Sequence, residues 1–329
     1  MKILWLYYYC KDFTTNHWLN IDFARAISKY PDVELKVYGL HAEIGYPDIS
    51  LCAYNKNITL DKLHSLFAFD VVIINTKSRM FKEYLPVLYP FNKTKKSIEI
   101  DCWLPSDFKS FKCPKVVIEE DYHYEINDDW YAQLGIDLLL QRHYSQARRV
   151  GKIPSIWFPF SVDTDVFKPS DSISYLDRKN KICFMGSDNE AYLYRNTVRK
   201  MLHNTSMLDD FGHSKTESDY ITNLQQYAVQ VCCSSIYNIT PAKMFEIMAC
   251  GSVLWTNNST NYGLQELFPR DSYFTYNENF SGICVTARSI LFDIDLRYEV
   301  TKNAMNCIHQ KHTHNTRIQE LLTIIRKYF

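Results

Sequence analysis

Residues 239–258 read ITPAKMFEIMACGSVLWTNN, and this stretch contains the signals of a helix followed by a strand. Thr240 and Pro241 predict the beginning of the helix, Thr240 as its N-cap and Pro241 as its first residue. Gly251 stands where the left-handed residue that ends a helix belongs, and the run SVLWT after it is typical of a buried strand. The stretch therefore predicts one helix-to-strand unit of an α/β sheet.

Short apolar runs alternate with helical patterns along the rest of the chain, which is typical of parallel α/β domains. The chain of 329 residues is long enough for two ordinary domains. Its runs form two series, and the second starts near residue 181 with KICFMGS. The expected strands are Ile3–Tyr9, Val33–Tyr38, Val71–Asn75, Ser97–Asp101, Val116–Glu119 and Asp137–Leu140 in the first series, and VQVCCSSI (229–236) and Ser252–Thr256 in the second.

A stretch with three prolines, residues 154–172, lies between the two series and is typical of a connection between domains. The sequence thus predicts two doubly wound, Rossmann-like α/β domains that face a cleft. The expected boundaries are an N-terminal domain at 1–155, a linker at 156–172, a C-terminal domain at 173–305 and a terminal helix at 306–329 that packs back toward the first domain.

The composition is that of a globular protein, with 46% hydrophobic and 22% charged residues. The formal net charge of +0 gives no overall attraction to nucleic acid or to an anionic membrane. Ten cysteines without a CxxC pair suit reduced thiols in a cytosolic compartment. The apolar start, MKILWLYYYCKD, is too short for a transmembrane helix, so we expect a first strand, a cytoplasmic location and no membrane span.

Lys243, Glu246 and Cys250 have the spacing i, i+3, i+7, which places them on one face of the predicted helix. The helix follows a strand, so its N-terminus points to the carboxyl edge of the sheet, where open α/β folds bind ligands. Such a terminus attracts phosphate, a lysine in the first turn adds positive charge, and a carboxylate one turn deeper can accept both hydroxyls of a ribose. These features indicate a nucleotide diphosphate site, and the alternative is an ordinary surface ion pair.

Two patterns resemble the glycosyltransferases of the GT-B architecture. Pro159-x-Ser-Val-Asp163-x-x-x-Phe167-x-Pro169 is similar to the interdomain segment of the large retaining family that uses nucleotide sugars. Lys243-x-x-Glu246-x-x-Ala249-Cys250-Gly251 is similar to the donor-site helix of that family. The basic residue three positions before the glutamate and the ending HTHNTRIQELLTII resemble the spore-maturation-type branch. The resemblance covers roughly residues 150–329, and in the first domain it is limited to the rhythm of the fold.

The resemblance implies the transfer of a hexose from a UDP- or GDP-sugar to an acceptor hydroxyl, with the acceptor on the first domain and the donor on the second. The donor is a co-substrate, and no cofactor or metal is expected. The acceptor class stays open between a glycan, a small molecule, a protein and a hydroxymethylated DNA base. Glu246 is expected to bind the ribose and Lys243 the phosphates. The expected donor-binding residues are Gly186, Arg195, Asn238, Thr240, Lys243 and Glu246.

The expected catalytic residues are Asp121, His123 and Lys243. Asp121 and His123 follow an apolar run in IEEDYHYE (118–125), where related enzymes often hold a residue that orients the acceptor hydroxyl or removes its proton. The retaining family usually has a second glutamate eight positions before the ribose-binding one, and this chain has Asn238 there. We expect retention, because the leaving diphosphate can take the acceptor proton while positive charge stabilises it.

Other functions are not excluded by the sequence. Asp163-Thr164-Asp165 matches the DxD motif of metal-dependent transferases, although its place in the linker favours a turn. His309, His312 and His314 suggest zinc, but no fourth ligand is near. A sugar-nucleotide or nucleic-acid binding module without catalysis remains the alternative, and Asn238 is its main support.

Overall fold

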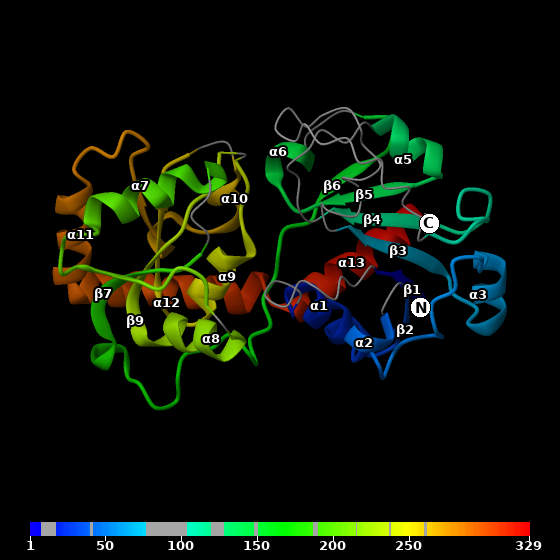
Figure 1. The fold of residues 1–329 in the computed structure, drawn as a ribbon, viewed down its shortest axis with the longest axis horizontal. Helices are drawn as coiled ribbons and strands as arrows, with labels where there is room; N and C mark the ends of the chain where they lie inside the picture. The colour runs from blue at the N-terminus through cyan, green and yellow to red at the C-terminus, as the bar shows by residue number, and fades with distance from the viewer. Residues whose placement is uncertain are drawn as a thin grey trace. The chain divides into compact units, whose positions relative to one another are not determined.

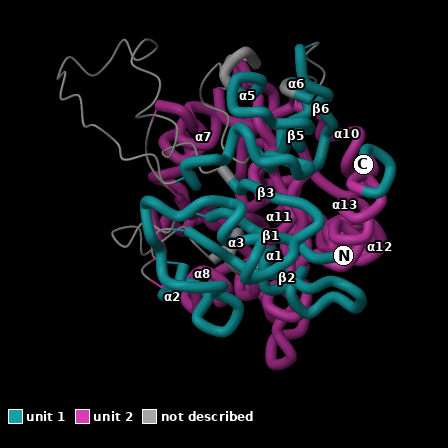
Figure 2. Tube along the Cα trace, turned by 90° about the vertical axis from the view of Figure 1, so that its right-hand side faces the viewer, with its two compact units in different colours: residues 1–158, 326–329 teal, residues 159–325 magenta. Residues whose placement is uncertain are grey.

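The computed structural model describes residues 1–7, 18–39, 42–76, 104–119, 128–147, 151–186, 190–214, 216–236, 238–259 and 262–329. These residues form two compact units (Figure 2). The first consists of Met1–Phe158 with Arg326–Phe329, and the second is Pro159–Ile325. Each unit contains one parallel sheet with helices around it, so the predicted α/β fold class of two Rossmann-like domains is confirmed (Figure 1).

The sheet of the first unit has the order β2-β1-β3-β4-β5-β6, and its described neighbours are all parallel. Side chains from adjacent strands, such as Leu4, Val72 and Val117, are buried in one core. The strands are β1 (Lys2–Leu6), β2 (Glu34–Tyr38), β3 (Val71–Thr76), β4 (Lys115–Glu119), β5 (Leu138–Gln141) and β6 (Ser155–Trp157), and the helices are α1 (Trp18–Ser28), α2 (Ala42–Gly45), α3 (Leu60–Leu66), α5 (Asp128–Leu134) and α6 (Tyr144–Ala147).

The strands predicted for this unit agree with the structure except at two places. The expected strand Ser97–Asp101 lies outside the described residues. Strand β6 occupies residues that the sequence assigned to the end of the first domain and the linker, and it pairs with β5 at the edge of the sheet. A strand of three residues between two prolines is too short to show an alternating pattern.

The sheet of the second unit has the order β11-β10-β9-β7-β8, again with parallel neighbours. Because β7 precedes β8 and β9 in the chain but lies between them, the direction of winding reverses between β7 and β9. Ligands of open α/β sheets bind at such a switch point, outside the carboxyl ends of the strands. The strands are β7 (Lys179–Phe184), β8 (Leu208–Asp210), β9 (Tyr227–Val231), β10 (Val253–Asn257) and β11 (Phe274–Tyr276).

The helices of the second unit include the one predicted from the stretch 239–258. It is α9 (Ala242–Ala249), which is buried along almost its whole length and ends at Gly251, whose φ of 71° is left-handed as predicted. The other helices are α7 (Leu193–Leu202), α8 (Glu217–Gln226), α10 (Leu264–Leu267), α11 (Ile283–Phe292), α12 (Ile294–Lys311) and α13 (His314–Tyr328), with 3-10 turns at Tyr175–Asp177, Glu190–Tyr192 and Arg270–Ser272.

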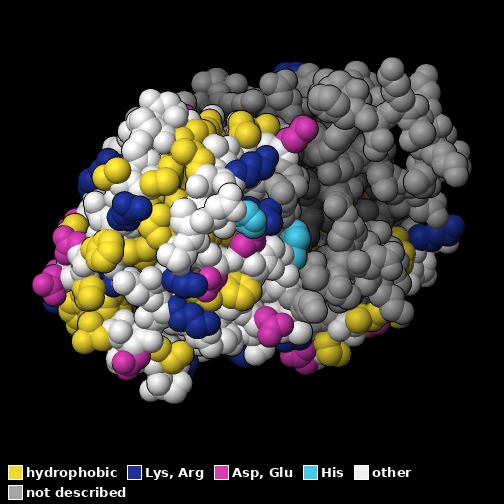
Figure 3. All heavy atoms as spheres, turned by 60° about the vertical axis from the view of Figure 1, so that its left-hand side comes forward, with side chains coloured by type: hydrophobic (Ala, Val, Ile, Leu, Met, Phe, Trp, Pro, Cys, Tyr) yellow, Lys and Arg dark blue, Asp and Glu magenta, His cyan; other side chains and the backbone are white. Residues whose placement is uncertain are grey.

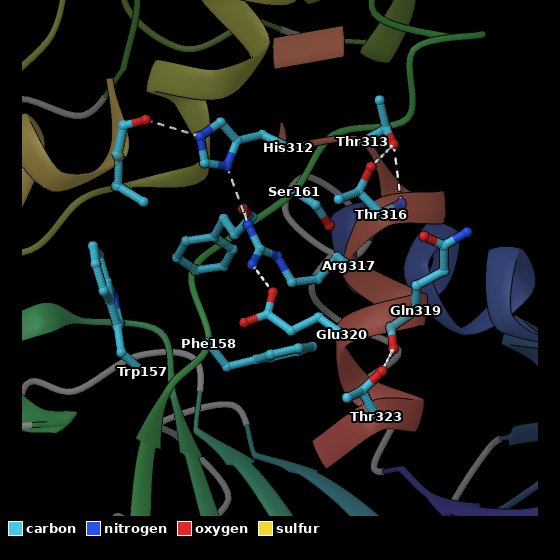
Figure 4. Close-up of polar contacts among 12 residues, drawn as sticks. Trp157, Phe158, Ser161, His312, Thr313, Thr316, Arg317, Gln319, Glu320 and Thr323 are labelled. Carbon is cyan, nitrogen blue, oxygen red and sulfur yellow. Dashed lines mark hydrogen bonds and ion pairs between the residues drawn. The ribbon is translucent and has the colours of Figure 1, made fainter. Parts of the chain in front are cut away.

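The segment that follows β6 is held by the turn between α12 and α13 (Figure 4). Val162 and Thr313 form a parallel bridge. The N–H of Val162 donates to the carbonyl of His312 at 3.0 Å, and the N–H of His314 donates to the carbonyl of Val162 at 3.1 Å. The Oγ of Ser161 lies 2.9 Å from Nδ1 of His314. These bonds fix the beginning of the second unit to its last two helices.

Two of the three histidines that suggested zinc, His312 and His314, take part in this packing. Nε2 of His312 lies 3.0 Å from the carbonyl oxygen of Leu267, and Nδ1 lies 3.1 Å from Nη2 of Arg317. Both ring nitrogens of His312 are therefore engaged, and burial lowers its pKa to about 4. Within the described ranges no group of three or more His, Cys, Asp or Glu residues is arranged to hold a metal ion.

Asp163 of the DxD-like triplet makes a turn, as its position predicted. Its Oδ1 accepts the N–H of Asp165 at 2.9 Å, and its carbonyl accepts the N–H of Phe167 at 2.8 Å. Cysteines of the described ranges, such as Cys183 and Cys232, are free thiols. None of the described helices is long and apolar enough to cross a membrane. The surface drawn in Figure 3 mixes hydrophobic, basic and acidic side chains, in keeping with the formal net charge of +0.

Candidate active site

The candidate site lies at the carboxyl ends of β7 and β9, where the winding of the second sheet reverses. The chain leaves β7 through Met185 and Gly186 and leaves β9 through residues 232–236. It then enters α9, and the first turn of this helix reaches the end of β7, because Lys243 bonds to the backbone of Met185. The structure thus places the predicted donor helix at the switch point of its sheet.

Lys243 brings a positive charge to the carboxyl edge of the sheet between β7 and β9. Its Nζ donates to the carbonyl oxygen of Met185 at 2.8 Å and lies 5.2 Å from the centre of the Tyr220 ring. Burial, together with the positive charge of nearby Arg195, lowers the pKa of Lys243 to about 8. An ammonium group whose charged form is disfavoured in this way is stabilised by an anion placed beside it.

Glu246 lies one turn further along α9 and has only 2% of its surface exposed. Its Oε2 accepts a hydrogen bond from the hydroxyl of Tyr220, a residue of α8. Burial, together with the adjacent carboxylate, raises the pKa of Tyr220 well above its usual value, so the phenol keeps its proton and donates. The alternative of a surface ion pair is therefore wrong for Glu246, because its carboxylate is inside the protein.

Arg195 and Gly186 lie against each other. Arg195 comes from the first turn of α7, is 4% exposed, and has its guanidinium carbon 3.9 Å from the centre of the Tyr192 ring. Gly186 has a φ of +132°, and a Cβ at this position would lie 2.6 Å from Nη2 of Arg195. Glycine therefore allows the guanidinium to approach the backbone at the end of β7, beside Lys243.

The chain matches known proteins in part of its sequence and in its fold. Residues 194–323 match a family model described as Glycosyl transferase-like, which covers α7, α8, α9 and most of the helices after them. The chain has the fold of a glycosyltransferase from Rickettsia africae ESF-5, with a TM-score of 0.64, 13% identity, and coverage of 99% of this chain and 98% of the other. The chain has the GT-B fold of these enzymes.

Two further solved structures share this fold. HepE of Anabaena in complex with UDP-glucose has a TM-score of 0.61 and 15% identity, with 99% of this chain and 100% of HepE covered. An alpha-glucosyltransferase in complex with UDP-glucose and DNA containing an abasic site has a TM-score of 0.60 and 10% identity, with 99% and 98% covered. No curated protein matches the chain by sequence. The likeness to the spore-maturation-type branch stays a prediction.

Thr240 does not cap α9, the predicted donor helix. The helix begins at Ala242, one residue later than predicted, and its N-cap is Pro241, with a ψ of 151°. The hydroxyl of Thr240 instead donates to the carbonyl oxygen of Tyr262 at 2.6 Å. The predicted N-cap role is wrong because this carbonyl, from the loop after β10, takes the hydroxyl. Thr240 thus ties the loop before α9 to the loop after β10.

Asn238, which stands where related enzymes have a second glutamate, lies in a left-handed turn. Its φ is 53°, and its N–H donates to the carbonyl of Ser235 at 3.4 Å. The Oδ1 of Asn238 accepts a hydrogen bond from Oγ of Ser259 at 3.3 Å. Asparagine tolerates a positive φ better than most residues. The left-handed backbone therefore accounts for an asparagine at this position.

The sequence missed Tyr220, the residue that contacts both Lys243 and Glu246. It lies in a helical pattern and is one of 24 tyrosines, so nothing in the sequence distinguishes it. Asp121 and His123, the predicted acceptor-side residues, lie outside the described residues. The structure therefore brings together Gly186, Arg195, Lys243 and Glu246, with Thr240 and Asn238 in the loop before α9.

Proposed function

We propose that this protein is a glycosyltransferase that moves a hexose from a nucleotide diphosphate-sugar to an acceptor hydroxyl. The proposal is supported by the convergence of Lys243, Arg195 and Glu246 at the carboxyl edge between β7 and β9. Two cations beside a helix N-terminus suit a diphosphate, and a carboxylate one turn deeper suits the hydroxyls of a ribose. The hexose itself is expected on the open side of the diphosphate.

A UDP-sugar, and UDP-glucose in particular, is the first donor to test. HepE and the alpha-glucosyltransferase, which share the fold, were both solved with UDP-glucose. GDP-sugars are the second choice, since the proposed contacts hold the diphosphate and the ribose and do not distinguish the base. The acceptor carries a hydroxyl, and its class must be found by assay.

The proposed reaction breaks the bond between C1 of the sugar and the diphosphate oxygen and forms a bond between C1 and the acceptor oxygen. The acceptor proton passes to the leaving diphosphate, as the expected retention of configuration requires. Lys243, Arg195 and the N-terminus of α9 stabilise the negative charge that grows on the leaving group. Because these groups supply the positive charge, we propose that the transfer proceeds without a metal ion.

Asp121 and His123 are proposed as the acceptor-side residues. In a retaining reaction they orient the acceptor hydroxyl, whereas in an inverting reaction one of them would be the base. The anomeric configuration of the first product, read by proton NMR, decides between these roles. A product with the configuration of the donor supports retention.

The donor site is tested by sugar release from UDP-glucose and from GDP-sugars. Lys243→Ala is expected to lower the rate by about a hundredfold, since removing one group that stabilises transition-state charge costs about this much. Lys181→Ala is the matched control, because this lysine lies within β7 and pairs with Asp209 at 2.6 Å. Unchanged turnover in Lys243→Ala would remove the proposed site, and loss of activity in EDTA would contradict metal independence.

A further inference from the structure

Tyr220 contacts both charged residues of the donor helix. Its hydroxyl donates to Oε2 of Glu246, and its ring centre lies 5.2 Å from Nζ of Lys243. The two contacts come from one buried side chain on α8. The strength of a hydrogen bond to a carboxylate depends on its direction, and so does the strength of a cation–π contact. Tyr220 therefore restricts the orientation of the Glu246 carboxylate and of the Lys243 ammonium group.

Tyr220 is itself held by the segment at the beginning of the second unit. The ring of Phe167 packs edge-on against the Tyr220 ring, with centroids 6.3 Å apart and planes at 78°. Phe167 is buried, and its N–H donates to Asp163 at 2.8 Å. At the other end of α8, Nε2 of Gln225 donates to the carbonyl of Lys168 at 2.8 Å. The segment therefore fixes α8 at two places.

We propose that Tyr220 is a positioning residue that orients the Glu246 carboxylate toward the ribose hydroxyls of the nucleotide and steadies Lys243 for the diphosphate. This inference rests on the proposed function, because it assumes that a nucleotide occupies the edge between β7 and β9. A carboxylate accepts several hydrogen bonds, so the bond from Tyr220 is compatible with bonds from a ribose. Phe167 acts through Tyr220 as the support of its ring.

The consequence is selectivity for the sugar of the nucleotide. A carboxylate held in one orientation gains most from two adjacent hydroxyls in a fixed geometry, and it gains less from a 2′-deoxyribose that offers one. Without the Tyr220 hydroxyl, Glu246 loses a bond that fixes its direction, and the advantage of the ribonucleotide decreases. If the role of Tyr220 were purely structural, its substitution would weaken the binding of both nucleotides to the same extent.

The test measures Kd by titration calorimetry for UDP and 2′-deoxy-UDP, and for GDP and 2′-deoxy-GDP, with the full-length protein. Tyr220→Phe is expected to weaken the binding of the ribonucleotide of the preferred pair roughly tenfold, which is the effect of losing one hydrogen bond to a charged group. The binding of the deoxynucleotide should weaken much less. Tyr227→Phe is the matched control, because the Tyr227 hydroxyl donates to another carboxylate, Asp209, at 2.7 Å. It should leave the ratio of the two affinities unchanged.

Glu246→Gln separates the failure of this inference from the failure of the proposed function. If Glu246→Gln reduces the ratio and Tyr220→Phe does not, Tyr220 is not a positioning residue, although the donor site stands. If no nucleotide binds the wild type, or if Lys243→Ala and Glu246→Gln bind like the wild type, the proposed function itself fails. Thermal unfolding of each variant shows whether it is folded, and an affinity ratio compares two ligands on the same folded protein.

Discussion

A Cβ atom at Gly186 would lie only 2.6 Å from Nη2 of Arg195, so these two residues cannot be varied independently. Gly186 follows β7 in a conformation, φ +132°, that residues with a side chain rarely adopt. The glycine thus serves the turn and leaves room for the guanidinium, and both functions concern the proposed diphosphate site.

Gly186→Ala is expected to move Arg195 and to weaken UDP binding by about tenfold or more, the size of one lost charge-assisted hydrogen bond. The added strain should also lower stability by about 1 kcal/mol. The control is Gly282→Ala, because Gly282 also has a positive φ, +69°, but its Cβ would meet nothing within 4 Å. Calorimetric Kd values that rise equally in both variants would show that strain alone is responsible.

UDP binding should weaken as the pH rises through about 8, the pKa of Lys243 in the free protein. A diphosphate favours the ammonium form, so it raises this pKa and binding takes up a proton between pH 8 and 9. The other ionisable neighbours are Arg195, Glu246, Cys183 and Cys232. Burial raises the pKa of both thiols, that of Cys232 to about 11, so they stay neutral in this range.

Titration calorimetry at pH 7, 8 and 9, in buffers with different ionisation enthalpies, measures both the affinity and the proton uptake. Lys243→Arg should flatten the profile, because a guanidinium keeps its charge. An affinity that is constant from pH 7 to 9 in the wild type would falsify the assigned role of the lysine.

Acid should destabilise the protein through His312. Burial lowers the pKa of His312 to about 4, below its value of about 6.5 in an unfolded chain. The unfolded state therefore binds more protons between these values, and the free energy of unfolding falls by up to about 1.4 kcal/mol per pH unit as the pH drops from 6.5 to 4. Urea unfolding at pH 4.5, 5.5 and 6.5 measures this slope.

His312→Gln should show a smaller slope than the wild type. His309→Gln is the matched control, since His309 lies near the end of α12 with its side chain exposed. The same loss of slope in both variants would mean that the buried environment of His312 is not the cause.

Arg178 should contribute to stability through the end of α9. Its Nη2 donates to the carbonyl of Cys250 at 2.7 Å, and its Nη1 donates to Oγ of Ser252 at 3.2 Å. Arg178→Met leaves a buried helix carbonyl without this donor, which should lower the free energy of unfolding by about 2 kcal/mol. Arg288→Met, at an exposed position of α11, should change it by less than about 0.5 kcal/mol in the same urea experiment. Equal losses would exclude the proposed contribution.

The sequence predicted those structural features that depend on residues close together in the chain. The alternation of apolar runs and helical faces gave most strands of both sheets, and Gly251 marked the end of α9, because these signals are local. Strand β6 was missed because three residues carry no period. The cap at Thr240 was wrong because the partner of its hydroxyl, Tyr262, comes from a loop 22 residues away.

The candidate site was predicted in part for the same reason. Lys243 and Glu246 were found because their spacing puts them on one helical face. Tyr220 lies 26 residues from Glu246, and their contact exists only because α8 packs beside α9. The contact between Gly186 and Arg195 also depends on how a loop and a helix meet.

The ring contact between Phe167 and Tyr220 bears on the engineering of donor preference. Transplanting α9 alone into another scaffold would transfer an ammonium and a carboxylate without the aromatic pair that aims them. A transfer of the site should therefore include the Phe167 turn, α8 and α9 together. Chimaeras that separate these parts should bind nucleotides with a smaller preference for the ribonucleotide over the 2′-deoxynucleotide.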